Sequence, residues 1–451
     1  MYIMEVIISI ISILNSRSFD FTFIVNISFL LFLILHIFIS VKSGRESIFN
    51  YIFLFSMGIF NYSTPDSIPL SPSIIMLIIS IISLSSAGIK KVHTGTFVII
   101  SFLVLCFLSY SYAPKILVTN DTVTGFFSSL ISIIILSLVL NNTEDIYRIC
   151  VLVCIAIGLI AFDYIILTFI GGDPYKDIPD LIDVSEADIR YESPMLGNNF
   201  FAIFGASILF LLTHIYLTLF KTTKYKWMIL FLLIIMVVSI LLTKSRSGVL
   251  LISASVIFIF IGSRIIQFKG KIKLMSTFLA GCVLFLTTNL GILISERINT
   301  ASEDSSILVR EEIRESAIIG IKEKIIWGWG LTTFQKYSGR DFEKNVSTHN
   351  TYLEILFSMG IIGLIGFAFI TFYPILLYMR KRNFMTNTEQ DFCVALISAM
   401  ICILIGGWNH EVFYERFYYL FITLLMSFIF TLSDSKTLNE PLSPEGLLNR
   451  G

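Results

Sequence analysis

Long apolar runs, separated by short polar segments, occupy most of this chain. A helix needs about 20 mostly apolar residues to cross a bilayer, and most of the runs reach roughly that length. The pattern therefore predicts an all-α integral membrane protein with about 12–14 transmembrane helices, the shortest runs being re-entrant or half-spanning. The candidate spans are 1–14, 21–41, 48–60, 73–89, 95–112, 123–140, 147–170, 198–220, 227–243, 247–263, 273–294, 351–379, 392–408 and 412–432.

The loops between these spans alternate in their content of Lys and Arg. One set carries basic clusters, such as those in 221–226 and 380–382, whereas the other set of short loops carries few. Because cytoplasmic loops hold the excess of basic residues, the first set is predicted to be cytoplasmic. With an even number of spans, both termini are then cytoplasmic as well.

This topology predicts how the chain is divided. Transmembrane helices occupy the N-terminal part and are interrupted by an acidic external loop, a large external loop with short helices follows, and further spans lead into a polar cytoplasmic tail. The corresponding ranges are 1–294 with the acidic loop at 171–197, then 295–350, 351–432 and 433–451.

Composition supports a membrane protein and excludes some partners. Only 14% of the residues are charged and 55% are hydrophobic, whereas soluble proteins carry about 25% charged residues. Lys and Arg together equal Asp and Glu, at 32 each, so no basic excess indicates a nucleic acid. The six cysteines all lie in apolar runs, which favours small packed side chains over a disulfide framework.

The first candidate functional segment is the turn 243–248 between two predicted spans. So short a connection must hold Lys244 and Arg246 at the outer membrane surface. A basic pair in an external turn runs against the charge rule, which favours a binding role. The structural alternative is an interface anchor whose side chains reach the lipid headgroups.

The second candidate lies in the large external loop. Arg310 and Arg314 are four residues apart and share one face of a predicted helix, and the segment 325–331, IIWGWGL, is predicted to turn back toward the membrane interface. A solvated helix with Glu–Arg pairs is the structural alternative.

The third candidate opens the predicted span 351–379. Thr351 and Glu354 have the spacing of a capping box, which would start the helix at this point. His349 lies just before it, where a helix N-terminus attracts anions. Asn350 and Tyr352 are its expected neighbours.

His349 and His410 are the two of the five histidines that fall at the external boundary. For His410, a contact with acceptor sugar competes with the simpler interpretation of a polar turn. Arginines and a histidine at one membrane face, with no metal-ligand pattern among the carboxylates, favour an anionic, phosphorylated substrate bound without a metal. The histidine is then a candidate general base.

These segments together resemble a known family. HNTYLEILFSMGIIGLIGF at 349–367, TKSRSGVLL at 243–251, and Arg310 followed by Gly328 and Gly330 occur in the order found in the O-antigen ligase and polymerase superfamily. The resemblance covers about 195–380, whereas the N-terminal spans are similar only in hydropathy.

The resemblance implies a GT-C-like glycosyltransferase of the Gram-negative inner membrane with a periplasmic active site. Such enzymes transfer glycan from undecaprenyl pyrophosphate without a metal or other cofactor. Expected partners are a lipid-linked oligosaccharide donor and acceptor and membrane lipids, with room for a chain-length regulator. The predicted catalytic residues are His349, Arg246 and Arg310, and the predicted substrate-binding residues are Arg314, Asn350, Tyr352, Lys244 and His410.

The exact reaction stays open between two activities. We favour the O-antigen polymerase over the ligase because the matches outside the core motifs are loose. The acidic segment 171–197 also suits neutral or basic sugars better than a phosphorylated lipid A–core. A lipid-linked oligosaccharide transporter is an alternative of another class, but it would be expected to show ionisable residues at mid-membrane or broken helices in matching halves. Asp163 is the clearest acid deep in a predicted span, and the sequence shows no repeat. A non-enzymatic scaffold is the remaining alternative.

Overall fold

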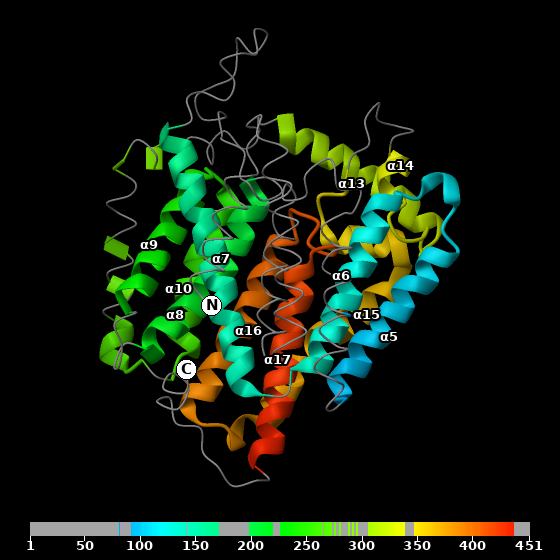
Figure 1. Cartoon of the computed structure of the whole chain (residues 1–451). Helices are drawn as coiled ribbons and strands as arrows, with labels where there is room; N and C mark the ends of the chain where they lie inside the picture. The colour runs from blue at the N-terminus through cyan, green and yellow to red at the C-terminus, as the bar shows by residue number, and fades with distance from the viewer. Residues whose placement is uncertain are drawn as a thin grey trace, which may run out of the picture. The chain divides into compact units, whose positions relative to one another are not determined.

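A computed structural model of the chain describes residues 92–140, 142–170, 198–219, 226–264, 305–338 and 347–436, together with Ile81 and short pieces between 266 and 295. Within these residues every regular element is a helix (Figure 1). Six of the helices are long and apolar enough to cross a membrane, and two shorter apolar helices accompany them. The protein is therefore an all-α, multi-pass membrane protein.

The helices follow the predicted apolar runs closely. They are α5 (Thr94–Ser111), α6 (Asn120–Val139), α7 (Thr143–Ile170), α8 (Asn198–Leu219), α9 (Lys226–Leu242), α10 (Arg246–Gly262), α15 (Thr351–Lys381), α16 (Asn387–Gly406) and α17 (Arg416–Lys436). The segment between α10 and α15, predicted to be an external loop, contains α13 (Ser305–Glu323) and α14 (Phe334–Ser338), and two short 3-10 helices are η1 (Lys115–Leu117) and η3 (Arg382–Phe384). Other predicted spans lie wholly or mostly outside the described residues. They are 1–14, 21–41, 48–60, 73–89 (except Ile81) and most of 273–294.

The last helix begins later than the apolar pattern indicated. The predicted span started at residue 412, but α17 starts at Arg416. The chain before it is held as a turn, because the Val412 amide donates to the Thr351 hydroxyl at 2.8 Å instead of entering a helix. This correction leaves a longer turn, 407–415, between α16 and α17.

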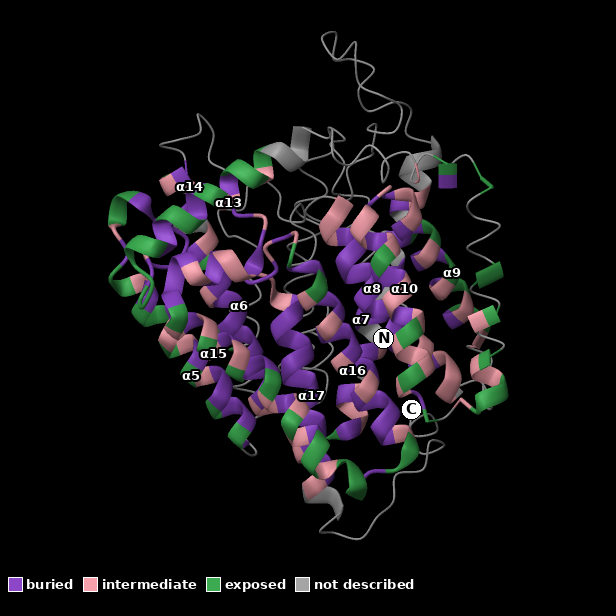
Figure 2. Ribbon diagram, turned by 180° about the vertical axis from the view of Figure 1, so that it is seen from behind, coloured by how far each residue is buried: buried purple, intermediate pink, exposed green. Residues whose placement is uncertain are grey.

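The chain forms two compact units, each assembled from separate stretches. In the first unit, α8 packs against α9, α10 and α16, and most of its residues are buried (Figure 2). A side chain at Gly205 or Gly248 would come within 3.0 Å of Ile240 on α9. Small residues thus allow these helices to approach closely, which is how transmembrane helices commonly associate.

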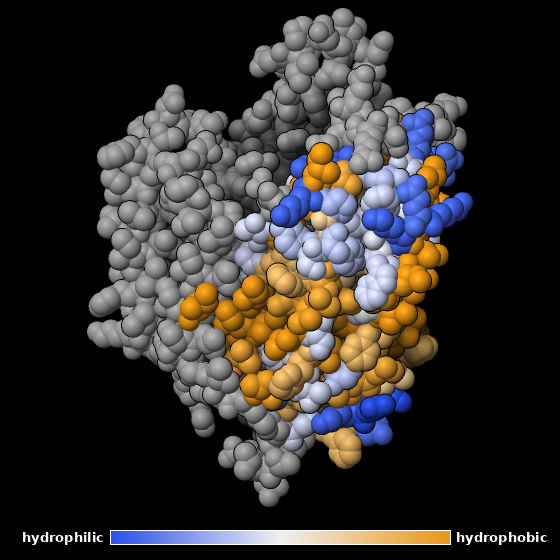
Figure 3. All heavy atoms as spheres, turned by 90° about the vertical axis from the view of Figure 1, so that its right-hand side faces the viewer, coloured by the Kyte–Doolittle hydropathy of each residue, from blue (hydrophilic) through white to orange (hydrophobic). Residues whose placement is uncertain are grey.

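In the second unit, α15 packs against α5 and α17, and α17 also packs against α6. The buried contacts are aromatic: the ring of Phe413 lies 5.3 Å from Phe126, 5.9 Å from Phe367 and 6.2 Å from Phe102. The outer faces of α5 and α15 expose large apolar residues such as Phe107 and Phe369, at 58% and 56%. Figure 3 shows this apolar band between hydrophilic residues at both ends, as expected for a surface in contact with lipid.

Helix α15 is broken at Gly360, where the sequence predicted a continuous span. Gly360 has φ 64° and ψ −163°, far from helical values. The break leaves backbone groups without partners inside the helix, and such groups must be satisfied when they are buried. The segment 325–330 supplies the partners: Trp329 and Gly330 donate to the carbonyls of Phe357 and Ser358, both at 2.8 Å.

The same segment also accepts hydrogen bonds from beyond the break. The amides of Ile361 and Ile362 donate to the carbonyls of Ile325 and Ile326, at 2.9 and 3.4 Å. Gly328 and Gly330 have φ of 72° and 105°, and an added Cβ at Gly328 would lie 2.6 Å from the backbone of α15. The Gly-Trp-Gly segment therefore attaches the loop before α15 to this apolar helix.

Candidate functional site

The turn 243–248 joins α9 to α10 in the first unit. Lys244 adopts a left-handed φ of 51°, and Ser245 caps α10 by accepting from the Gly248 amide at 3.3 Å. The Ser245 hydroxyl also donates to Asn199 at 2.9 Å, which ties the turn to the start of α8. Arg246 is consequently the first residue of α10, at a helix end that favours anions.

The segment 347–351 opens α15 in the second unit. Asn350 is the N-cap, and its side-chain oxygen accepts from the amides of Tyr352 and Leu353 at 2.9 and 3.0 Å. The predicted capping box of Thr351 and Glu354 is therefore wrong by one residue. Glu354 is 3% exposed and accepts from the hydroxyls of Tyr414 and Ser358 instead, at 2.7 and 2.9 Å.

Asn350→Ala is expected to lower the free energy of unfolding by about 2 kcal/mol, since loss of an N-cap and of a further buried hydrogen bond each cost about 1 kcal/mol. The second bond joins the Asn350 amide nitrogen to the Trp408 carbonyl at 2.8 Å. Thermal unfolding of the purified protein in detergent measures the effect. Asn350→Asp keeps the capping oxygen but loses the donor, so a loss for Asp equal to that for Ala would contradict the capping role.

Hydrogen bonds join the start of α15 to the turn 407–415. The Thr351 amide donates to the Gly407 carbonyl at 2.8 Å, and its hydroxyl donates to the His410 carbonyl at 2.7 Å. The rings of Tyr352 and Trp408 also lie 6.0 Å apart. These contacts bring His410 to the segment that carries His349, although the two residues are 61 positions apart.

Both histidines lie near the positive charge of Arg310. Burial first, and the Arg310 charge second, lower the pKa of His349. Burial, Arg310 and His349 together lower the pKa of His410 to about 3. The arrangement thus favours neutral histidines beside a cation, and a neutral histidine can accept a proton.

His349 is also in an unusual backbone conformation, with φ of 49°. Among the described residues, Lys244 and Thr332 are the other non-glycine residues with a left-handed φ. Such conformations cost free energy and gather at functional sites. Two of the three fall on residues that the sequence had singled out.

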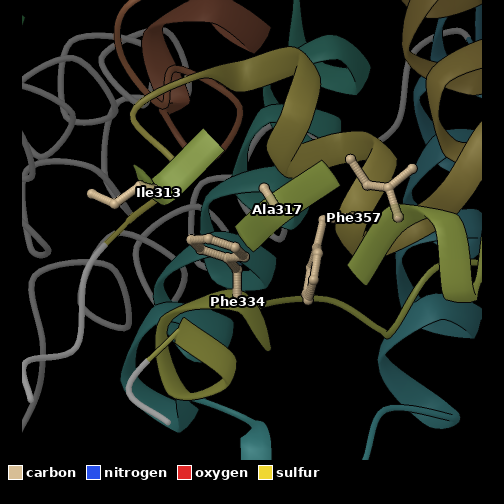
Figure 4. Packing of buried hydrophobic residues seen from close by; sticks show 5 residues of the cluster. Ile313, Ala317, Phe334 and Phe357 are labelled. Atoms are coloured by element: carbon tan, nitrogen blue, oxygen red, sulfur yellow. The ribbon is translucent and has the colours of Figure 1, made fainter. Parts of the chain in front are cut away.

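Arg310 is positioned by the packing of α13. Ile313, Ala317 and Ile321 form the buried face of this helix and pack with Phe334 of α14 and Phe357 of α15 (Figure 4). Arg310 precedes Ile313 by one turn and is half-buried on the same face. Arg314 is half-buried one turn further on, but Arg310 is the arginine whose charge acts on the two histidines.

The second unit therefore brings together Arg310, His349, His410, Asn350 and Tyr352, with Arg314 on the same helix as Arg310. Lys244 and Arg246 belong to the first unit. Glu411 and Tyr414 also lie at this site. Sequence reasoning considered Glu411 only together with His410, as a possible contact to the acceptor sugar, and gave no role to Tyr414. The available signal was an acid directly beside His410 in an otherwise apolar C-terminal region.

Arg310 brings a positive charge to a cluster that also holds two histidines. Across the described residues, no three or more His, Cys, Asp or Glu side chains gather as a potential metal site. Arg310 is the group that can pair with phosphate oxygens here, since its guanidinium keeps its charge and offers a fork of donors. A neutral histidine next to that cation can accept a proton from a hydroxyl that approaches the bound anion.

A known protein family matches the part of the chain that contains several of these segments. The model of the O-antigen ligase family matches residues 231–368, which is less than a third of the chain. No curated protein matches the chain. The matched region contains the turn 243–248, Arg310, the Gly-Trp-Gly segment and His349. The match thus supports a membrane glycosyltransferase-like protein of the O-antigen ligase and polymerase superfamily.

Proposed function

We propose that this chain polymerises O-antigen repeat units by transferring glycan from undecaprenyl pyrophosphate to a lipid-linked repeat unit. The reaction takes place on the periplasmic side of the Gram-negative inner membrane, with both termini of the chain in the cytoplasm. The observation that carries this proposal is the position of His349 near the charge of Arg310, within the residues that match the family; burial and that charge lower the pKa of His349.

The residues divide into two roles in this mechanism. Arg310, with Arg314 on the same helix, binds the lipid pyrophosphate and stabilises the negative charge that develops as it leaves. Arg246 and Lys244 are assigned to the same role from the sequence motif alone. His349 takes the proton from the acceptor hydroxyl as its oxygen attacks the anomeric carbon. Asn350, Tyr352 and His410 contact the acceptor, and direct displacement inverts the sugar at that carbon.

His349→Ala is expected to reduce glycan transfer about a hundredfold, the lower part of the range for a lost general base. The measurement is release of undecaprenyl pyrophosphate from lipid-linked repeat units by purified protein. The amount and the detergent thermal stability of the variant should equal those of the wild type, since His349 is half-buried and does not belong to the apolar core. A fully active variant would remove the base assignment.

The ligase is the second candidate because the matching family model is described as O-antigen ligase. It would use the same residues but would transfer the finished glycan to lipid A–core. Offering purified lipid A–core and a lipid-linked repeat unit as competing acceptors separates the two activities. The polymerase proposal expects elongated lipid-linked product, whereas transfer to lipid A–core alone would replace it with the ligase.

A further inference from the structure

The carboxyl group of Glu411 contacts the segment that carries His349. Its Oε1 accepts from the amide of Thr348 at 2.5 Å and from the hydroxyl of Thr348 at 2.7 Å. Thr348 is fully buried, so these bonds are shielded from water. Glu411 is therefore fixed against the residue that immediately precedes His349.

Ser347 connects the same carboxyl to the imidazole ring. The Ser347 hydroxyl hydrogen-bonds to Glu411, and its oxygen lies 3.4 Å from Nδ1 of His349. A hydroxyl can donate one hydrogen bond while it accepts another. Glu411, Ser347 and His349 thus form a continuous path that ends at a ring whose second nitrogen, Nε2, is not part of this path.

The residues around this path shift the pKa values of the two groups at its ends, Glu411 and His349. Burial and the charge of Glu354 on α15 raise the pKa of Glu411 to about 8. Burial and Arg310 on α13 lower the pKa of His349. Among the described residues, His410 and Tyr414 lie on the same turn as Glu411 and also face the path, with Tyr414 donating to Glu354 at 2.7 Å.

We propose that Glu411 receives, through Ser347, the proton that His349 takes from the acceptor hydroxyl. This inference rests on the proposed function and assigns a proton-accepting, positioning role to a residue outside the matched region 231–368. It gives a chemical role to a buried acid that lies close to a histidine with a lowered pKa. It also follows the general arrangement in which a third group orients a base.

The proton and electron balance closes without a further reactant. The acceptor oxygen bonds to the anomeric carbon, and the bond from that carbon to the phosphate oxygen breaks, so that the electron pair leaves with the lipid pyrophosphate. The acceptor proton moves to Nε2 of His349. The proton on Nδ1 moves to the Ser347 oxygen, whose own proton moves to the Glu411 carboxylate.

Glu411→Gln tests the proposal, because glutamine keeps an oxygen for the Thr348 bonds but cannot take up a proton. The expected kcat for undecaprenyl pyrophosphate release from lipid-linked repeat units is at least tenfold lower, with an unchanged KM for the donor. In the wild type, kcat should fall as the pH drops below about 8, because Glu411 becomes protonated. The variant should lack this pH dependence.

Glu415→Gln is the matched control. Glu415 lies in the same turn, and burial raises its pKa to about 7, but its charged neighbour is Arg416. It should leave both kcat and its pH dependence unchanged. Ser347→Ala interrupts the path without touching the carboxyl group and should lower kcat as Glu411→Gln does.

The outcomes separate this inference from the proposed function. A Glu411→Gln protein with wild-type kcat and pH profile, measured beside a defective His349→Ala protein, would overturn the role of Glu411 alone. A folded wild-type protein that releases no undecaprenyl pyrophosphate would overturn the proposed function itself. A Ser347→Ala protein with wild-type kcat would overturn the route through the hydroxyl.

Discussion

Replacing Arg310 with alanine is expected to reduce glycan transfer about a thousandfold, because removal of one group that stabilises developing negative charge costs about 10²–10³ in kcat. The same change removes the charge that lowers the pKa of His349 and His410. Both pKa values should therefore rise. Turnover of lipid-linked repeat units measures the loss of transfer, and an NMR titration of the two histidines measures the rise of their pKa values.

Two variants on the same helix serve as controls for Arg310. Arg310→Lys keeps the charge but loses the forked donor geometry and should retain part of the activity. Arg314→Ala removes an arginine one turn away, whose charge does not act on the two histidines, and should lose much less than Arg310→Ala. Equal losses of activity for the two alanine variants would contradict a specific role for Arg310.

Gly360→Ala is expected to leave little folded protein. An added Cβ would lie 2.2 Å from the Ile326 carbonyl oxygen, and the φ of 64° is one that other residues adopt at a cost. That cost is about 1–2 kcal/mol. The clash would also separate the backbone bonds between 325–330 and α15, each worth about 1 kcal/mol. The sum approaches the roughly 5–15 kcal/mol by which proteins are stable.

Gly366→Ala is the matched control for Gly360→Ala. Gly366 lies on the same helix, and an added Cβ would meet only the end of the Leu105 side chain, at 2.5 Å. That flexible side chain can move, so this variant should accumulate in the membrane at close to the wild-type level. Fluorescence-detected size exclusion in detergent compares the two, and a normal profile for Gly360→Ala would show that the break in α15 is not required for folding.

The positions of the transmembrane helices could be predicted from the sequence because the bilayer requires long apolar runs. The predicted spans 95–112 and 198–220 lie within a residue or so of α5 and α8. The break at Gly360 could not be predicted in this way, since the residues around it are as apolar as those of an unbroken helix. The break depends on hydrogen bonds to a segment some 30 residues earlier in the chain.

The candidate site could likewise be predicted from the sequence only in part. The proximity of His349 and Arg310 could be predicted, because the predicted topology put the start of one span and a loop helix at the same membrane face. The role of Glu411 could not, because it depends on Thr348 and Ser347, which are more than 60 residues away in the sequence. The N-cap was misplaced because Asn350 and Thr351 are both good caps, and local spacing alone favoured the Thr–Glu pair.

The most direct test of the account is a gel of lipopolysaccharide from the native host with the gene for this chain deleted. The polymerase proposal predicts that the ladder disappears and that a core band carrying a single repeat unit remains, because ligation continues without polymerisation. Bare core, with polymer accumulating on undecaprenyl pyrophosphate, would instead identify the ligase. An unchanged ladder would contradict both activities and would point to other lipid-linked glycans or to transport.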